Sequence, residues 1–277
     1  MILINGENQQ GIDCTDRGFQ YGDGVFETLE ISNGRVVYLD HHLNRLAVGC
    51  QRLLIPTPEI SILKQEISGL IQSHARSVLK IIITRGVGGR GYRQPETINA
   101  TRVLSIHPFP DYPADYKTEG VNIRFCDTRL GQNRRLAGLK HLNRLEQVLA
   151  RAEWQDRNIQ EGLMFDSEDN LIEGTMTNLF LVENARLLTP QLDQCGVDGI
   201  VRNIIIELAQ VNGLIIEELR VSKARILAAE EVFLTNSIIG MWPVKNLDGH
   251  AFGIGEITRQ LDTWLDDFKQ KDCQNGL

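Results

Sequence analysis

A single lysine inside an apolar stretch is the first indication of chemistry in this sequence. Lys140 lies in Leu136-Ala137-Gly138-Leu139-Lys140-His141-Leu142, directly before a segment whose apolar residues recur at helical spacing. Removal from water disfavours the charged ammonium and lowers its pKa, which allows the amine to form a Schiff base or act as a general base. The alternative is a lysine whose stem packs against neighbours while its ammonium reaches water.

A carboxylate and an arginine could complete a site around this lysine. Glu173 ends a short apolar run and precedes small residues that leave room for a flat ligand. In a cleft it would pair with a cationic nitrogen, whereas in an exposed turn it would be a solvated charge. Arg45 has apolar neighbours in a helical pattern. Most helical arginines lie at the surface, but a buried one needs an anion, and phosphate is a natural partner.

Two later segments offer donors for the same anion. In Asp198-Gly199-Ile200-Val201 a glycine precedes a helix, so the amides of Ile200 and Val201 could bind phosphate. In Thr235-Asn236-Ser237 polar residues follow a buried strand. A lysine, a carboxylate, an arginine and a helix N-terminus together describe a site for pyridoxal 5′-phosphate. The lysine would form the imine, the carboxylate would hold the pyridinium nitrogen, and the other groups would hold the phosphate.

The segment Gly86-Val87-Gly88-Gly89-Arg90-Gly91 matches a dinucleotide-binding pattern but lacks the helix that should follow it. A second strand follows instead, so the pattern predicts a hairpin loop between strands at 78–84 and 102–106. This loop would expose Arg90 and Tyr92. Arg90 is either a solvated charge or a fork of donors suited to a carboxylate.

The first third of the chain predicts strands with helices inserted between them. A strand at 25–31 turns at Asn33-Gly34 into a hairpin, and helices follow at 43–54 and 60–71. Prolines concentrated between His107 and Pro113 indicate a linker.

The remainder predicts a meander of short strands with helices before and after it. The segment that follows Lys140 places several apolar residues on one face of a helix: Leu142, Leu145, Val148, Leu149 and Ala152. The other predicted elements are strands at 121–126, 163–165, 171–173, 179–182, 187–188 and 232–235, and helices at 201–211 and 256–271. Because strands and helices mix without regular βαβ alternation, we expect an α+β fold. It would have a small N-terminal domain (1–107), a linker (108–114) and a larger cofactor-binding domain (115–277) with a mixed meander or barrel.

Composition limits the classes of function. The 277 residues carry a net charge of −7, which argues against nucleic acid or an anionic membrane as a partner. Five scattered cysteines without a CxxC pair favour a reduced, cytoplasmic protein over a disulfide framework, and neither they nor the six histidines have metal-site spacing. We expect neither a signal peptide at Met1–Gly6 nor a membrane-spanning segment.

Three motifs carry a resemblance to a known family. Asp16-Arg17-Gly18-Phe19-Gln20-Tyr21-Gly22-Asp23-Gly24-Val25-Phe26-Glu27-Thr28 resembles the N-terminal motif of fold-type IV pyridoxal-phosphate enzymes. That family includes branched-chain and D-amino-acid aminotransferases and 4-amino-4-deoxychorismate lyases. The segments 138–149 and 84–92 resemble the lyase members specifically. Leu145 occupies the position where branched-chain aminotransferases carry a tyrosine, which disfavours that activity.

The resemblance implies roles for individual residues. Lys140 would be the Schiff-base lysine and general base, and Glu173 would pair with the pyridine nitrogen. The remaining cofactor contacts would come from Arg45, Ile200, Val201, Asn236 and Ser237.

The resemblance also implies a homodimer with shared sites, in which Arg90 binds a substrate carboxylate in the neighbouring subunit. Tyr92 and Phe26 would contact the substrate, and Thr28 is a candidate to protonate the departing group. An aminotransferase on the same fold, and a phosphate-ligand-binding protein without catalysis, remain the alternatives.

Overall fold

The computed structural model describes residues 1–72 and 74–275, and the chain divides into two compact units. The first contains Met1–Pro110, Leu139–Asn143 and the chain from Lys269 onward, and the second contains Asp111–Gly138 and Arg144–Phe268. These units differ from the expected domains (1–107 and 115–277, with a linker at 108–114) in three ways, the first being that the chain from Lys269 groups with the first unit. The final strand of the first unit continues to Pro108, and the lysine segment belongs to the first unit because it pairs with a strand there.

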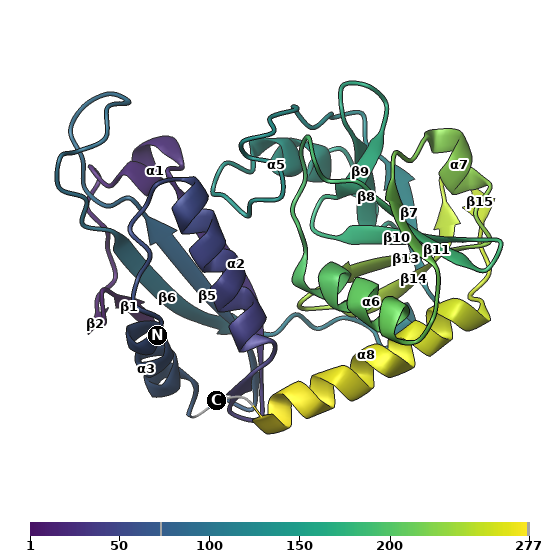
Figure 1. The fold of residues 1–277 in the computed structure, drawn as a ribbon, viewed down its shortest axis with the longest axis horizontal. Coiled ribbons are helices and arrows are strands. Elements are labelled where there is room, and N and C mark those ends of the chain that lie inside the picture. Colours follow the sequence, from purple (N-terminus) through teal and green to yellow (C-terminus); the bar gives the residue numbers. More distant parts are fainter. Residues whose placement is uncertain (73, 276–277) are drawn as a thin grey trace. The chain divides into compact units, whose positions relative to one another are not determined.

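A six-stranded antiparallel sheet forms the centre of the first unit (Figure 1), in the order β2-β1-β6-β5-β3-β4. One apolar cluster lies between a face of this sheet and helices α2 and α3; it includes Leu29, Leu79, Leu46 and Leu63. The elements of this unit are β1 (Ile2–Ile4), β2 (Glu7–Asn8), α1 (Arg17–Tyr21), β3 (Gly24–Ser32), β4 (Arg35–Val36), α2 (Leu39–Arg52), α3 (Ile60–Ile71), β5 (Arg76–Thr84) and β6 (Thr101–Pro108).

Both predicted hairpins of this unit are confirmed. Asn33 and Gly34 have φ values of 51° and 73°, as the two central residues of a tight hairpin turn require, and β3 pairs with β4. β5 and β6 pair antiparallel, so the glycine-rich loop joins two strands. It lacks the helix that should follow a dinucleotide-binding motif.

The second unit is built around a mixed sheet that has nine strands among the described residues, in the order β12-β11-β10-β13-β14-β7-β8-β9 with β15 beside β14. Leu171 of β9 donates its amide to the Val221 carbonyl just beyond β12 (2.7 Å), so the two ends of the strand order meet and the sheet curls. The strands are β7 (Val121–Phe125), β8 (Glu161–Phe165), β9 (Leu171–Gly174), β10 (Asn178–Glu183), β11 (Arg186–Pro190), β12 (Ile216–Leu219), β13 (Glu231–Asn236), β14 (Gly240–Leu247) and β15 (His250–Ala251).

The helices of this unit are short except for α6 and α8, which the periodicity predicted. They are α4 (Asp115–Thr118), α5 (Leu145–Arg151), α6 (Ile200–Val211), α7 (Lys223–Leu227) and α8 (Glu256–Asn275). The expected α+β class with a mixed sheet is confirmed. No helix of the described residues is both long and apolar enough to cross a bilayer.

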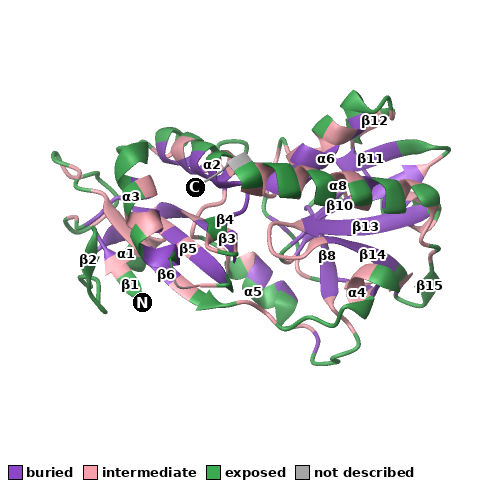
Figure 2. Cartoon of the chain, turned by 90° about the horizontal axis from the view of Figure 1, so that it is seen from below, coloured by how far each residue is buried: buried purple, intermediate pink, exposed green. Residues whose placement is uncertain are grey.

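Helix α5 differs from its expected form. It begins at Leu145, so Leu142 lies outside it, and much of the helix is coloured as exposed (Figure 2). Leu145 is 76% exposed, and Val148 and Leu149 are each 61% exposed. The inward face carries Gln147 and Ala150 instead, and Ala150 packs in the small cluster around Trp154.

Candidate active site

Lys140 is fixed by backbone pairing at the edge of the first sheet. The Phe26 amide donates to the Lys140 carbonyl (3.0 Å), and the Leu142 amide donates to the Gly24 carbonyl (3.0 Å). Residues 140–142 therefore run beside the start of β3 as an additional edge segment. The half-buried Lys140 side chain places Nζ 4.5 Å from the centre of the Phe26 ring.

Phe26 and Thr28 share one face of β3, because side chains two apart on a strand point the same way. Thr28 is half-buried and lies opposite Lys80 of β5 in the register. The Lys80 ammonium is 5.5 Å from the same Phe26 ring. Phe26, Thr28 and Lys140, all predicted site residues, thus lie near a second lysine, Lys80, which the sequence analysis did not predict. The only sign of it in the sequence was a charged residue within the apolar strand at 78–84.

On the opposite face of β3, a buried carboxylate fixes Arg45. Arg45 Nε donates to Glu27 Oε1 (2.7 Å) and Arg45 Nη2 donates to Glu27 Oε2, while His42 Nδ1 lies 2.6 Å from Oε2. Burial raises the pKa of Glu27, but Arg45 and His42 outweigh it and lower that pKa to about 2. The predicted role of Arg45 in binding phosphate stays a prediction. The carboxylate that orients its guanidinium, Glu27, was not among the predicted site residues.

In the second unit, Glu173 lies on β9 and is almost fully buried. Its Oε2 accepts the Val197 amide (2.7 Å) and its Oε1 accepts a long bond from Gln147 Nε2 (3.4 Å). Gly138, two residues before Lys140 in the chain, pairs with the same segment: its amide donates to the Gly196 carbonyl (2.9 Å) and its carbonyl accepts the Asp198 amide (3.0 Å). The backbone of residues 196–198 therefore binds both the Glu173 carboxylate and Gly138, which lies two residues before Lys140.

The start of α6 has no side-chain cap. Gly199 is the N-cap and contributes no side-chain bond to the first turn, where Ile200 and Val201 lie buried. A Cβ at Gly199 would lie only 1.9 Å from Asn178 Oδ1, so this close approach requires glycine. Helix N-termini with amides not bound by a cap favour phosphate through those amides and the helix dipole.

Asn236 is the last residue of β13, and Ser237 follows it. Thr235 pairs with Asn178 in the register, and Asn178 Nδ2 donates to the Val197 carbonyl (2.9 Å). Asn236 Nδ2 donates to the Met176 carbonyl (3.1 Å), while its Oδ1 accepts the Ile238 amide (2.8 Å). The second unit thus brings Glu173, the α6 N-terminus and the Asn236 turn around Asn178 and Val197.

Glu161 is a further buried carboxylate that the sequence interpretation missed. Its Oε1 accepts the amide of Gly162 (2.8 Å) and both the amide and hydroxyl of Thr175 (3.0 and 2.5 Å), and its Oε2 accepts the Met176 amide and Thr177 hydroxyl (3.1 and 3.0 Å). These donors hold the turn that follows Glu173. The only signal in the sequence was a charge at the start of an apolar strand.

Arg90 and Tyr92 lie in the loop between β5 and β6. The Arg90 side chain is exposed and Tyr92 is 87% exposed. Their predicted contacts with a substrate bound in a neighbouring subunit stay predictions.

Known proteins are similar to this chain along nearly its whole length. An aminodeoxychorismate lyase from Vibrio harveyi is 34% identical over 266 residues, spanning 94% of this chain and 98% of that protein. The crystal structure of 4-amino-4-deoxychorismate lyase from Pseudomonas aeruginosa superposes with a TM-score of 0.93 at 44% identity, covering 96% of this chain and 98% of the other. A D-alanine aminotransferase from Bacillus licheniformis is 28% identical, covering 95% of each chain.

The model of one protein family matches residues 24–247, which include every predicted site residue. The fold-type IV architecture that the motifs implied is confirmed. The chain belongs to the amino-transferase class IV family.

Proposed function

We propose that this protein is a pyridoxal-phosphate-dependent lyase that converts 4-amino-4-deoxychorismate to 4-aminobenzoate and pyruvate, a step of folate synthesis. The main support is the 44% identity to a structure of that lyase across nearly the whole chain. The relative named as a D-alanine aminotransferase is more distant at 28% identity. The exposed, apolar Leu145 also offers no hydroxyl where branched-chain aminotransferases carry a tyrosine.

The residues present fit the phosphate and the pyridine ring of this cofactor. Glu173 is a buried carboxylate whose Oε2 is held by the Val197 amide. The first turn of α6 and the Asn236–Ser237 turn offer donors for the phosphate, together with Arg45. When bound, pyridoxal phosphate supplies an aldehyde that combines with amines and a ring that accepts electrons.

The chain's own residues then have distinct tasks. Lys140 would hold the cofactor through Nζ, and this amine would be free once substrate is bound. The freed Nζ then removes the proton from the carbon that bears the substrate amine. Glu173 keeps a proton at the pyridine nitrogen, so that the electrons of the broken C–H bond can be accepted. The enolpyruvyl group leaves from the adjacent carbon, Thr28 protonates it as it departs, and the ring becomes aromatic.

Substrate binding in this proposal requires a homodimer. Arg90 binds a substrate carboxylate in the other subunit's site, where Tyr92 and Phe26 make further contacts. Two features support a partner: Arg90 and Tyr92 project from the protein on an exposed loop, and α5 exposes three apolar residues. Two-fold symmetric dimers are also the commonest oligomers.

Hybrid dimers test the shared site. Arg90→Ala and Lys140→Ala homodimers should each be nearly inactive. A purified hybrid of the two should regain one working site, formed by Lys140 of the first variant and Arg90 of the second. A fully active monomer, or a verified hybrid without activity, contradicts the shared site.

The reaction itself is tested by product analysis with purified protein. Incubation with 4-amino-4-deoxychorismate should yield 4-aminobenzoate without any added keto acid. A requirement for a keto acid would favour the aminotransferase, and absence of turnover with either substrate class would favour a binding protein. We place the reaction in the cytoplasm, which is compatible with five free cysteine thiols.

A further inference from the structure

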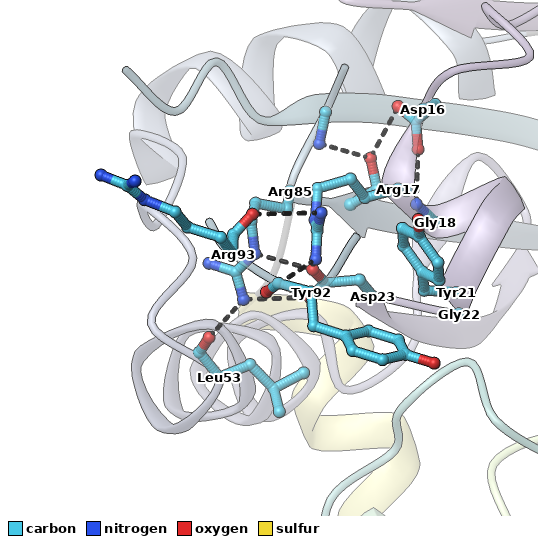
Figure 3. Close-up of polar contacts among 12 residues, drawn as sticks. Asp16, Arg17, Gly18, Tyr21, Gly22, Asp23, Leu53, Arg85, Tyr92 and Arg93 are labelled. Atoms are coloured by element: carbon cyan, nitrogen blue, oxygen red, sulfur yellow. Dashed lines mark hydrogen bonds and ion pairs between the residues drawn. The ribbon is translucent and has the colours of Figure 1, made fainter. Parts of the chain in front are cut away.

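The loop that carries Arg90 and Tyr92 accepts hydrogen bonds from the buried guanidinium of Arg17. Arg17 of α1 is 3% exposed, and it directs donors at three successive residues of the loop, of which Figure 3 labels Tyr92 and Arg93. Nη1 donates to the carbonyls of Gly91 (2.9 Å) and Arg93 (3.5 Å), and Nη2 donates to the carbonyl of Tyr92 (3.5 Å). The bond to Gly91 is the short one, and it lies next to Arg90.

Other contacts of α1 fix the same stretch of loop. The Arg17 amide donates to the Gly86 carbonyl (2.9 Å), and a Cβ at Gly88 would lie 2.6 Å from Arg17 Cδ. The Gly91 amide donates to the hydroxyl of Tyr21 (3.1 Å), whose ring lies 5.7 Å from that of Tyr92 in an edge-to-face arrangement. The loop therefore rests on α1 from Gly86 to Arg93.

A shared carboxylate compensates for the burial of this charge. Arg17 Nε and Arg85 Nε both donate to Asp23 Oδ2, at 3.0 and 2.7 Å. Burial raises the pKa of Asp23, but the bonds from Arg85 and Arg17 outweigh it and lower that pKa. Arg85 is equally buried, and its Nη2 also donates to Asp23 Oδ1 (3.0 Å); its other side-chain bonds go to the Leu53 and Leu54 carbonyls after α2 and not to the loop.

We propose that Arg17 is a positioning residue that sets the conformation of the 86–93 loop and thereby presents Arg90 to the substrate carboxylate. The inference rests on the proposed function, because it assigns Arg90 a task in the neighbouring subunit's site. A long loop is free to adopt many conformations unless contacts restrain it. Fixing it before substrate arrives reduces the ordering that binding must otherwise impose.

Hydrogen exchange tests the restraint without any assay of activity. In Arg17→Met, the amides of Gly88 and Gly91, which donate to the Thr15 carbonyl and the Tyr21 hydroxyl, should exchange at least about tenfold faster than in the wild type. Arg85→Met is the matched control, since it removes an equally buried partner of Asp23 but no contact to the loop. It should leave the exchange of these two amides unchanged. Equal protection of the loop in wild type and Arg17→Met would overturn the proposal.

Kinetics of the holoenzyme test the consequence for substrate. Arg17→Met should lower kcat/KM by up to about 10²-fold, mostly through KM, because the misplaced group binds substrate and does not transfer the proton. Arg17→Lys keeps the charge beside Asp23 but lacks the fork of donors, so it should recover the fold while leaving KM raised. A loss confined to kcat in both variants would contradict the proposal.

Hybrid dimers then show in which subunit Arg17 acts. The working site of the Arg90→Ala/Lys140→Ala hybrid uses the loop of the Lys140→Ala subunit. Adding Arg17→Met to that subunit should raise KM, whereas adding it to the Arg90→Ala subunit should not. An equal effect from either placement would overturn the proposal. If the parent hybrid has no activity, the shared site fails, and hydrogen exchange alone decides whether Arg17 holds the loop.

Discussion

Each unit buries a carboxylate almost completely, but the two are stabilised by different partners. In the first unit, Glu27 contacts a guanidinium and an imidazole, and its pKa falls to about 2. In the second, Glu161 is surrounded by five neutral donors from Gly162, Thr175, Met176 and Thr177, and burial raises its pKa despite them.

The difference parallels the kinds of predicted site residue that each unit contains. The first unit contains the cations Lys140, Arg45 and Arg90, and its buried Glu27 orients Arg45. The second contains Glu173 and the first turn of α6, and its buried Glu161 orients backbone in the turn after Glu173. Variants of each group should therefore fail in different ways.

Lys140→Ala should cause the largest loss. It removes both the attachment point of the cofactor and the general base, so turnover should fall by at least about 10⁴-fold. Steady-state assays measure this loss, with circular dichroism to confirm the fold. Lys64→Ala, a change at a partly exposed lysine of α3 paired with Asp40, is the control and should remain near wild-type activity. One tenth of wild-type activity in Lys140→Ala would exclude the assigned role.

Glu173→Gln should follow, with kcat lower by about 10²–10⁴-fold while much of the cofactor is retained. Glutamine keeps the size of the side chain but cannot stabilise a protonated pyridine nitrogen. Bound cofactor can be quantified from its absorption in the same samples used for kinetics. Glu168→Gln, at an exposed turn between β8 and β9, is the matched control. An unchanged kcat in Glu173→Gln would place this residue outside the site.

Glu27→Gln should chiefly reduce stability. It leaves Arg45 partly buried without its carboxylate, and breaking such a pair costs about 3–5 kcal/mol of the free energy of unfolding. Urea denaturation of the apoprotein measures this cost, and titration with pyridoxal phosphate should show weaker binding if Arg45 holds the phosphate. Stability equal to wild type would show that the Glu27 pair contributes little.

Acidification should affect the Glu27 pair in a defined pH window. The folded pKa of about 2 lies below the ordinary value of 4.5, so the stabilisation is complete above pH 4.5 and is lost as pH falls towards 2. His42, whose pKa burial lowers, adds a loss that begins below its ordinary value of 6.5. Glu27→Gln should flatten the part of the stability profile between pH 4.5 and 2, measured by urea denaturation at each pH. A profile parallel to wild type would contradict the pKa assignment.

Glu161→Gln should have the smallest effect. The amide nitrogen of glutamine cannot accept a hydrogen bond, so the donors that now bind one of the two Glu161 oxygens would lose their acceptor. The free energy of unfolding should fall by about 1–3 kcal/mol. Because no cation is left unpaired, the cost should be below that of Glu27→Gln in the same urea measurement. A larger loss than in Glu27→Gln would reverse the comparison between the units.

The sequence predicted elements whose signal is local. The Asn33-Gly34 turn, the periodic helix α6 and the strands of the meander all form where their patterns indicated. It failed where the outcome depends on distant residues. The apolar side of α5 is exposed because Gln147 and Ala150 face inward, and nothing in the helix itself signals that choice.

The same limit applies to the site. Lys140 and Glu173 were predicted as site residues because their neighbours are unusual and match family motifs, and their roles stay predictions. Glu27, Lys80 and Glu161 were missed, because a charged residue in a strand has no local mark that separates a buried partner from a solvated side chain. Arg17 was quoted only as part of a motif, and its contacts to Gly91 and Arg93 span more than seventy residues of sequence.

The stoichiometry of products tests the central claim most directly. Wild-type holoenzyme should release 4-aminobenzoate and pyruvate in a one-to-one ratio over many turnovers of 4-amino-4-deoxychorismate, with no keto acid added. This result would show that the protein catalyses an elimination that restores the enzyme after each cycle. A single turnover per site that resumes only when a keto acid is supplied, without 4-aminobenzoate, would contradict it and assign the protein to transamination.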